Sequence, residues 1–211
     1  MFLNNNDGQI NGNSIIVTGR GRITAVPDLA IIRLGVITSG EVLSDIQEYN
    51  ARISQSVLNG LRNMGIEDIR TYRYLIDKIY EFENNLRIDR GYSVQNMFEI
   101  QTGMLDTVGT VIDVAVSLGA NLVESISFEV STIDQYYLEA LRQALLNGIE
   151  KASVMAEVFN TRPDPVPKRI VENSLPVPLS RTFFRDELAA TPIEPGTTNI
   201  EAVVTMEFGY S

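Results

Sequence analysis

Alternation of apolar and polar residues with a period of two runs through seven segments of the chain. Such alternation is typical of strands that bury one face and expose the other. Asn84 and Asn85 separate two of these segments and tolerate left-handed backbone angles, which predicts a long hairpin with a tight tip. The predicted strands are residues 14–20, 30–36, 69–82, 86–102, 122–130, 168–172 and 200–208.

Three other segments repeat their apolar residues every three or four positions, which predicts amphipathic helices. They cover residues 42–64, 107–118 and 133–159. Gly65 and Gly119 follow the first two and suit left-handed caps. Ser44 with Gln47 and Thr132 with Gln135 match capping boxes, and Asp106 is placed to cap the second helix. The residues predicted to form the buried face of the first helix are Val42, Ile46, Tyr49, Ile53, Val57, Leu61 and Met64.

The element order is therefore β-β-α-β-β-α-β-α-β-β. Because each strand has one polar face, we predict an α+β fold with largely antiparallel sheets packed against helices. Within residues 122–130, Glu124 falls on the apolar side of the strand pattern.

The third predicted helix carries a small residue at every fourth position, at Ala140, Ala144, Gly148, Ala152 and Ala156. A ridge of small side chains lets another backbone approach closely. Two interpretations stay open: the ridge packs on the protein's own sheet, or it forms a helix–helix contact between subunits at Ala144, Gly148 and Ala152.

Residues 173–199 show little regular pattern, and seven of the eight prolines lie between Pro163 and Pro195. A loop of this length is either functional or disordered. The adjacent aromatic residues Phe183 and Phe184 are possible contacts for assembly, with plain surface packing as the alternative.

The composition excludes much familiar chemistry. The chain has 211 residues, no histidine and no cysteine, so it has no Ser-His-Asp triad, no thiolate nucleophile and no zinc–sulfur site. We expect no cofactor and no metal. The net charge of −10 argues against nucleic acid as a partner.

What remains is chemistry by carboxylates or lysines, and no residue pattern singles out a catalytic site. Glu81 and Glu83 lie opposite Arg87, Asp89 and Arg90 across the predicted hairpin, which indicates cross-strand ion pairs. Tyr72, Tyr74 and Tyr80 are predicted to share one face of a strand, where packing is the first interpretation and ligand stacking the second. Gly19-Arg20-Gly21 lacks the third glycine and the following helix of a dinucleotide loop.

Taken in order, these segments resemble the SIMPL domain family over residues 15–208. The resemblance is carried by Val17-Thr18-Gly19 with Gly21, Pro27-Asp28, Gly65-Ile66, Asp68-Ile69 with Thr71, Gly91-Tyr92, Val108-Gly109, Val111-Ile112-Asp113, Gly119-Ala120, Glu139-Ala140-Leu141, Ala144, Lys151-Ala152, Ala156, Ile193, Pro195-Gly196 and the strand that ends at Phe208.

The resemblance implies two small α/β plait-like subdomains, which we expect at residues 14–90 and 91–211, after a disordered tail at residues 1–13. It also implies a protein of the bacterial envelope, linked with stress tolerance or immunogenicity, that assembles into ring- or channel-like oligomers. No catalytic residue is implied by it.

The leading functional hypothesis is a non-enzymatic interaction protein that forms homo-oligomers. The alternatives are a carboxylate-dependent, glycosidase-like hydrolase, which needs two acidic groups about 5–10 Å apart in a cleft, and a small-ligand carrier, which needs a pocket of about 300 Å³ or more. Residues 1–14 show no secretory signal, and no apolar run reaches the roughly 18 residues of a membrane span. The residues as they stand therefore predict a cytoplasmic protein, or an envelope or secreted protein if a leader was removed.

Overall fold

The computed structural model describes residues 13–84, 86–173, 182–183 and 196–211, the pair 182–183 by its backbone alone. The chain divides into two compact units. Unit 1 is built from Met1–Ala25, Thr132–Leu179 and Asn199–Ser211, and unit 2 from Val26–Ser131 and Ser180–Thr198.

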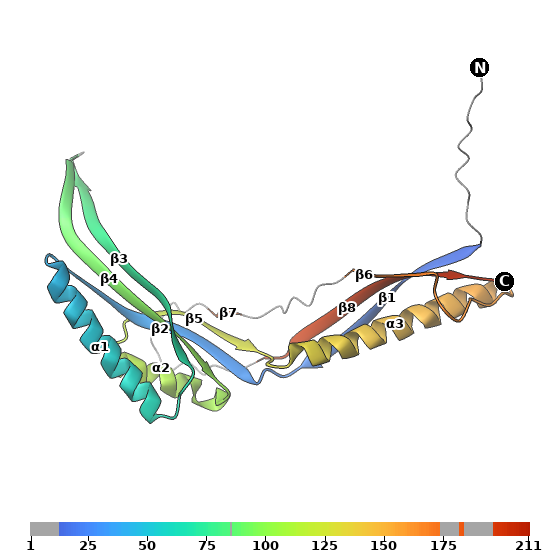
Figure 1. Cartoon of the computed structure of the whole chain (residues 1–211), viewed down its shortest axis with the longest axis horizontal. Coiled ribbons are helices and arrows are strands. Elements are labelled where there is room, and N and C mark those ends of the chain that lie inside the picture. The colour runs from blue at the N-terminus through green and yellow to red at the C-terminus, as the bar shows by residue number, and fades with distance from the viewer. Residues whose placement is uncertain (1–12, 85, 174–181, 184–195) are drawn as a thin grey trace, which may run out of the picture. The chain divides into compact units, whose positions relative to one another are not determined.

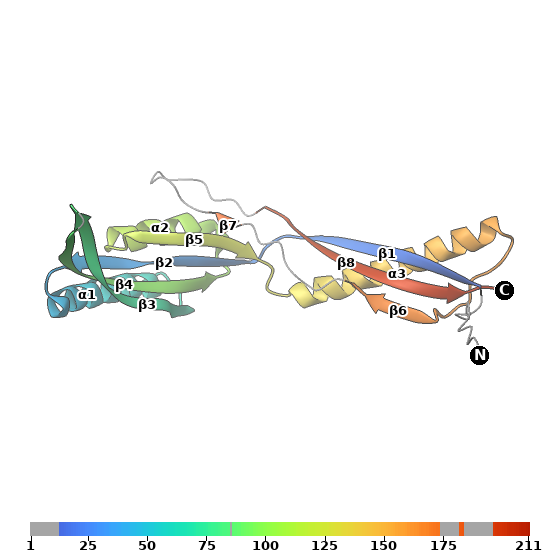
Figure 2. The same cartoon turned by 90° about the horizontal axis from the view of Figure 1, so that it is seen from above.

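Unit 2 is a five-stranded antiparallel sheet with two helices on one of its faces (Figure 1). Its strands lie side by side in the order β3-β4-β2-β5-β7 (Figure 2). Apart from the short β7, this is the order of a β-α-β-β-α-β plait. The elements are β2 (Leu29–Gly40), α1 (Leu43–Asn63), β3 (Ile69–Glu83), β4 (Leu86–Thr102), the 3-10 helix η1 (Leu105–Thr107), α2 (Val108–Ser117), β5 (Leu122–Glu129) and β7 (Thr182–Phe183).

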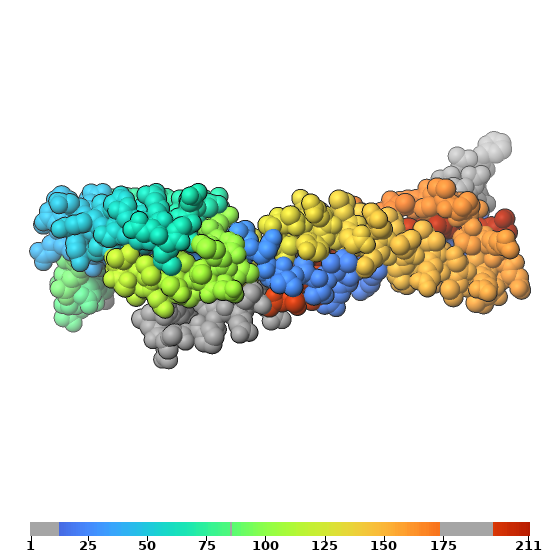
Figure 3. Space-filling model, turned by 90° about the horizontal axis from the view of Figure 1, so that it is seen from below, coloured from blue at the N-terminus to red at the C-terminus, as the bar shows by residue number. Residues whose placement is uncertain are grey.

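The core of unit 2 lies between the sheet and its helices, as the alternating pattern predicted. Figure 3 views the molecule from the side on which α1 and α2 cover the sheet. Every second residue of β2 is buried in one cluster with apolar residues of both helices. The members from these three elements are Ala30, Ile32, Leu34, Val36, Val57, Leu61, Val108, Val111, Ile112 and Ala115.

The buried face of α1 differs from the predicted one. Tyr49 is exposed, whereas the polar Asn50 and Ser54 are buried. The Nδ2 group of Asn50 donates hydrogen bonds to the carbonyl oxygens of Val36 (3.1 Å) and Val94 (3.0 Å), so this buried amide is satisfied. A periodicity count selects apolar residues and cannot recognise a polar residue whose partners lie on distant strands.

Unit 1 is a three-stranded sheet in the order β1-β8-β6 with one long helix packed on it (Figure 1). Its elements are β1 (Ser14–Ala25), α3 (Ile133–Val158), β6 (Arg169–Glu172) and β8 (Thr198–Gly209). The predicted α+β class, with antiparallel sheets packed against helices, is confirmed. Unit 2 has the full plait order, whereas unit 1 has a single helix on three strands.

The division at residue 90 predicted from the sequence is wrong. It would cut the β3–β4 hairpin, in which pairs run from Glu83 with Leu86 to Ile69 with Ile100. Unit 1 instead joins segments from both ends of the chain, and a hydrogen bond from Thr24 to Asn199 (3.0 Å) spans 175 positions. Residues 1–12 of the predicted tail at residues 1–13, and most of the predicted loop at residues 173–199, lie outside the described residues.

The predicted glycine caps at the C-terminal ends of the first two helices are confirmed, whereas the predicted side-chain caps at the N-terminal ends are wrong. Gly65 (φ 83°) and Gly119 (φ 107°) adopt left-handed angles, as does Asn84 (φ 49°) at the hairpin tip. The first residues of α1, α2 and α3 receive no side-chain cap, and Asp106 lies within η1. Among the described residues, no helix is long and apolar enough to cross a membrane.

Candidate functional site

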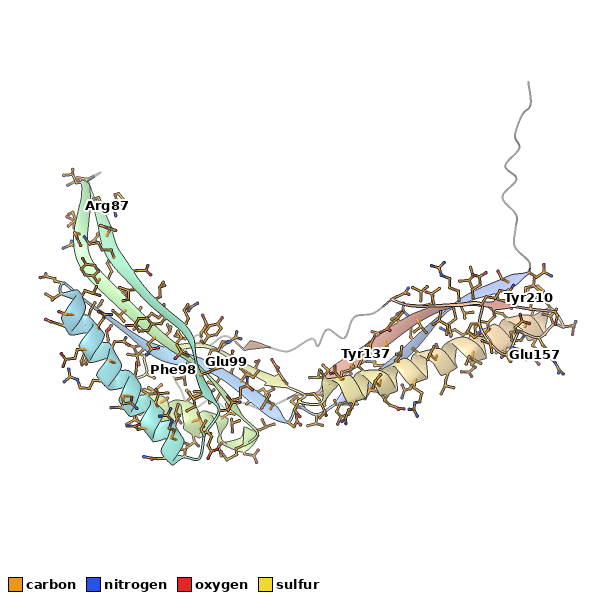
Figure 4. All side chains as sticks on the ribbon, viewed as in Figure 1. Arg87, Phe98, Glu99, Tyr137, Glu157 and Tyr210 are labelled. Atoms are coloured by element: carbon orange, nitrogen blue, oxygen red, sulfur yellow. The ribbon has the colours of Figure 1, made fainter. Side chains whose placement is uncertain are left out.

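The face of the unit 2 sheet opposite α1 and α2, which we call the open face, carries a cluster of charged side chains. Within the described residues no helix covers it. Phe98 and Glu99 are neighbours on β4 and point to opposite faces: Phe98 pairs with the core residue Leu34 and points toward the helices, and Glu99 points to the open face (Figure 4). The strand register pairs Glu99 with Arg33 on β2 and with Arg70 on β3, so three adjacent strands bring the three charges together.

Glu99 is held by both arginines. Its Oε2 accepts a hydrogen bond from Arg33 Nε (2.8 Å), and its Oε1 accepts from Arg70 Nε (3.0 Å) and from Arg70 Nη2. The side chain of Glu99 is only 5% exposed, against 37% for Arg33 and 64% for Arg70. The ring of Tyr72 lies 4.3 Å from the guanidinium carbon of Arg33. We call Arg33, Arg70 and Glu99 the arginine clamp.

The electrostatics of the clamp leave one surplus positive charge. Burial pushes the pKa of the Glu99 carboxyl upward, but the hydrogen bonds from Arg70 and Arg33 outweigh it, and the pKa lies below the ordinary glutamate value. The same hydrogen bonds raise the pKa of both guanidinium groups. Two cations therefore face one anion.

A second ion pair lies beside the clamp. Arg73 Nη2 donates to Glu124 Oε1 at 2.8 Å. The register between β2 and β5 shifts between Arg33 and Leu34, and this β-bulge lets Glu124 lie on the open face although the strand pattern placed it on the apolar side. Arg73 Nε and Glu124 Oε2 are buried without a hydrogen-bond partner among the described residues.

The predicted common face of the three tyrosines is not formed. The register between β3 and β4 shifts between Thr71 and Arg73, so Tyr72 and Tyr74 point to opposite faces. Tyr72 stacks on Arg33 at the open face, whereas Tyr74 accepts a hydrogen bond from Gln47 of α1 (3.4 Å). A bulge of one residue breaks the period of two, and the sequence carries no recognisable sign of it.

In the distal part of the β3–β4 hairpin, residues 74–92, most of the described residues on both faces are exposed, and we call this part the outer hairpin. The predicted cross-strand ion pairs are confirmed for Arg90, which contacts Glu81 (2.7 Å) and Glu83 (2.8 Å), and a further pair joins Lys78 to Asp89 (2.5 Å). Six large apolar side chains of the outer hairpin are exposed: Tyr80 and five others. The five others are Tyr74, Leu75, Ile76, Phe82 and Leu86.

The α3 residues predicted as possible oligomer contacts lie in the interior of unit 1. Ala144 and Ala152 are fully buried, and Gly148 is also buried. The ridge packs on the protein's own sheet, because a Cβ built on Gly19 of β1 would lie 2.0 Å from the Ala144 carbonyl oxygen. The ridge therefore offers no surface to a second subunit in this fold. Phe183 belongs to β7 by its backbone, and Phe184 lies outside the described residues.

A depression of about 630 Å³ lies in unit 1 at the C-terminal end of α3. Glu157 and Asp164 line it together with Arg162, and Ile149 and Phe208 contribute apolar surface. Figure 4 labels Glu157 at this end of the helix. In the described part of the chain, no group of three or more acidic residues is arranged to hold a metal ion.

The arginine clamp was not identified from the sequence, although a signal was present. Arg33 and Glu99 are the charged residues within otherwise apolar alternating strands, at Ile32-Arg33-Leu34 and Phe98-Glu99-Ile100. Opposite charges at such positions indicate strands that lie next to each other. Recognising the pair requires knowing that β2 and β4 are neighbours, which only the sheet order reveals.

Comparison with known proteins agrees with the fold and with the motifs. The SIMPL family model, described as a protein of unknown function (DUF541), matches residues 15–208. The chain belongs to the SIMPL family. The match covers the strands and helices of both units, including the clamp and the α3–β1 contact.

Relatives of this SIMPL protein include two bacterial proteins. It is 31% identical over 191 residues to the 26 kDa periplasmic immunogenic protein of Brucella melitensis. The matching region covers 84% of this chain and 75% of that protein. It is 24% identical over 200 residues to the uncharacterized protein YggE of Escherichia coli (strain K12). Here the matching region covers 93% of this chain and 80% of that protein.

Proposed function

We propose that this SIMPL protein is a non-enzymatic, envelope-associated protein that assembles with copies of itself through the outer hairpin. The observation that carries the proposal is the exposure of Phe82 (74%) and Leu86 (70%) near the hairpin tip. Phe82 pairs with Arg87 and Leu86 with Glu83, so the two apolar side chains lie on opposite faces. Both faces of the hairpin tip therefore offer a large apolar side chain for contact with another protein molecule.

The position of β3 supports the same surface. β3 is an outer strand of the unit 2 sheet, with residues 69–83 and no described strand on its free side. A free edge offers backbone N–H and C=O groups to a strand of another molecule. A second copy supplies both a matching strand and matching apolar side chains.

The envelope location is inferred from relatives. The Brucella relative is named as a periplasmic protein. A link with stress tolerance, implied by the family resemblance, stays a prediction. Separation of periplasmic and cytoplasmic fractions from the source cells tests the location, and recovery of the protein with the cytoplasmic markers would contradict it.

Sedimentation velocity tests the assembly. We expect the wild-type protein to form species larger than a monomer at micromolar concentrations, and the variant Phe82→Ser/Leu86→Ser to remain monomeric with an unchanged circular dichroism spectrum. Phe159→Ser is the matched control, because Phe159 is 73% exposed at the end of α3 and lies outside the hairpin. A monomeric wild-type protein, or equal assembly of the hairpin variant, would refute the proposal.

Small-ligand binding in the unit 1 depression is a second candidate function. Its volume of about 630 Å³ exceeds the roughly 300 Å³ that a small-ligand pocket needs. Glu157 and Asp164 are the acidic pair that a hydrolase would use, but Glu157 is exposed, whereas a carboxyl group acting as a general acid needs an enclosed apolar site. Native mass spectrometry of the freshly purified protein tests binding, and a mass equal to that of the polypeptide alone counts against it.

A further inference from the structure

We propose that the arginine clamp on the open face of unit 2 binds one oxyanion group, a carboxylate or a phosphate, of a small ligand. This inference is independent of the proposed assembly, because the clamp lies on β2, β3 and β4 nearer the middle of the sheet than the outer hairpin.

Charge is the first argument. The protein has a net charge of −10, yet the clamp sets two guanidinium groups against one carboxylate. Among the neighbouring charges, Arg73 is paired with Glu124, and Asp68 attracts Arg70 without forming a hydrogen bond to it, so the surplus is that of the three clamp residues themselves. A local positive charge in an otherwise acidic protein attracts a small anion.

The remaining donors are the second argument. Arg33 and Arg70 use Nε and Nη2 toward Glu99, and within the described part of the chain the Nη1 group of neither arginine donates a hydrogen bond. Arg70 is 64% exposed, so its free donors reach solvent. Guanidinium donors held in a fixed plane match the oxygen spacing of carboxylates and phosphates.

Preorganisation is the third argument. Glu99 is almost fully buried and orients both arginines, and the ring of Tyr72 lies over Arg33. All of these side chains project from paired strands, which hold a site more accurately than loops do. Little conformational entropy is therefore lost when an anion binds.

Stability alone does not account for the arrangement. A buried ion pair is weak evidence for stability, because apolar residues of similar volume are often as stabilising. One arginine would neutralise Glu99, and the mostly exposed Arg70 adds little as a surface pair. An anionic ligand that binds to the second guanidinium group would account for the presence of two arginines at one carboxylate.

The surroundings suggest what the rest of the ligand looks like. Tyr72 is exposed on the open face, and its ring contacts Arg33 of the clamp. We therefore expect an anionic group attached to a part with some apolar surface. Inorganic phosphate and acetate are the simplest probes for the anionic group alone.

Titration of the full chain with sodium phosphate and with sodium acetate tests the site, with sodium chloride at equal ionic strength as the reference. The readout is the set of arginine Nε–Hε resonances in ¹H–¹⁵N spectra. We expect saturable shifts of the Arg33 and Arg70 resonances with phosphate, acetate or both, and each of these results supports the site and identifies its anion. Shifts no larger than those in chloride would overturn the proposal.

Arg70→Gln is the variant of choice, because it keeps the Arg33–Glu99 pair while removing the surplus charge. We expect it to weaken anion binding by about tenfold or more, as loss of a charge-assisted hydrogen bond does. Arg90→Gln is the matched control: Arg90 is also an exposed arginine of unit 2, but it is bonded to two glutamates and carries no surplus charge. It should bind within about twofold of wild type.

The variant Arg70→Lys distinguishes loss of charge from loss of geometry, because lysine retains the positive charge but lacks the planar guanidinium group. We expect Arg70→Lys to bind anions with an affinity between those of the wild type and Arg70→Gln. Equal binding by the wild type and Arg70→Gln, with both proteins folded, would overturn the proposal.

Discussion

Two glycines of β1 determine how closely α3 approaches the sheet of unit 1. A Cβ on Gly19 would lie 2.0 Å from the Ala144 carbonyl oxygen, and one on Gly21 would lie 1.9 Å from the Ala140 carbonyl oxygen. Both obstacles are backbone atoms and cannot rotate away. The small residues of α3 and the glycines of β1 are thus two halves of one contact.

We predict that Gly19→Ala destabilises the protein by about 1–3 kcal/mol or more, because the methyl group forces the helix away from the strand. Urea unfolding followed by circular dichroism measures the loss. Gly109→Ala is the control: no atom lies within 4 Å of its Cβ position, and alanine should be neutral or stabilising by up to about 1 kcal/mol within α2. Equal effects of the two substitutions would contradict the contact.

Glu99 should make stability depend on pH in the acid range. Its pKa is lowered in the folded protein, so its stabilising effect is present above the unfolded value of about 4.3 and is lost as the pH falls through the folded pKa. We expect Glu99→Gln to be less stable than wild type by roughly 1–3 kcal/mol at pH 7. The difference should shrink below pH ~4.

The control for this pH effect is Glu201→Gln. Glu201 is half exposed, and its ion pair with Arg20 is long, at 3.9 Å. Its difference from wild type should be small at every pH. A constant difference between wild type and Glu99→Gln from pH 3 to pH 7 would show that the carboxylate is not held as described.

At the scale of elements, the outer strands β1 and β3 differ at their free edges. The free edge of β1 is covered by a polar row of α3: Asn147 and Gln143 accept hydrogen bonds from the Arg20 and Arg22 backbone N–H groups (3.1 and 3.4 Å), and Lys151 donates to the Thr18 carbonyl (2.8 Å). A covered edge cannot pair with another chain. The outer strand β3 has no such cover among the described residues, and this contrast favours the outer hairpin as the assembly surface.

The helix starts give an element-scale prediction. Ser44 and Thr132 match capping boxes in the sequence, but α1 begins after Val42 without a side-chain cap, and the Ser44 hydroxyl bonds to Asp45 (3.0 Å). We therefore expect Ser44→Ala to change the free energy of unfolding by less than about 0.5 kcal/mol, whereas removal of a true cap costs about 1 kcal/mol. A loss of 1 kcal/mol or more, measured by thermal unfolding, would show that Ser44 caps the helix.

At the scale of the whole molecule, one unit is almost continuous in sequence and the other is not. Nearly all of unit 2 lies between residues 26 and 131, whereas unit 1 needs β1, α3 and β8 from three distant segments. The Asp28 carboxylate accepts hydrogen bonds from the Ser131 backbone N–H (2.7 Å) and hydroxyl (2.6 Å), which joins the two ends of that continuous segment. These bonds also lower the pKa of Asp28.

We predict that a fragment of residues 26–131 folds by itself and unfolds cooperatively in urea, because it retains the plait core and both of its helices. A fragment of residues 132–211 should not fold, since α3 loses the glycine strand β1 on which it packs. Far-UV circular dichroism and one-dimensional NMR distinguish the outcomes. An unfolded 26–131 fragment would contradict the independence of unit 2.

The sequence alone determined the local structure: seven strands and three helices, the Asn84 tip, and the ends at Gly65 and Gly119 followed from periodicity and backbone preference, which act over a few residues. The eighth strand, Thr182–Phe183, was missed, since two residues cannot show a period. The SIMPL resemblance was also available from the order of the motifs.

Only the tertiary structure decided which of these local elements meet. The glycines of β1 and the ridge of α3 were both visible in the sequence, but 119 or more positions separate them, and nothing local pairs them. The arginine clamp depends on β4 lying between β2 and β3, and the split of the tyrosines depends on one bulge. Periodicity reports which face of an element is buried, whereas partner choice is set by contacts between residues far apart in sequence.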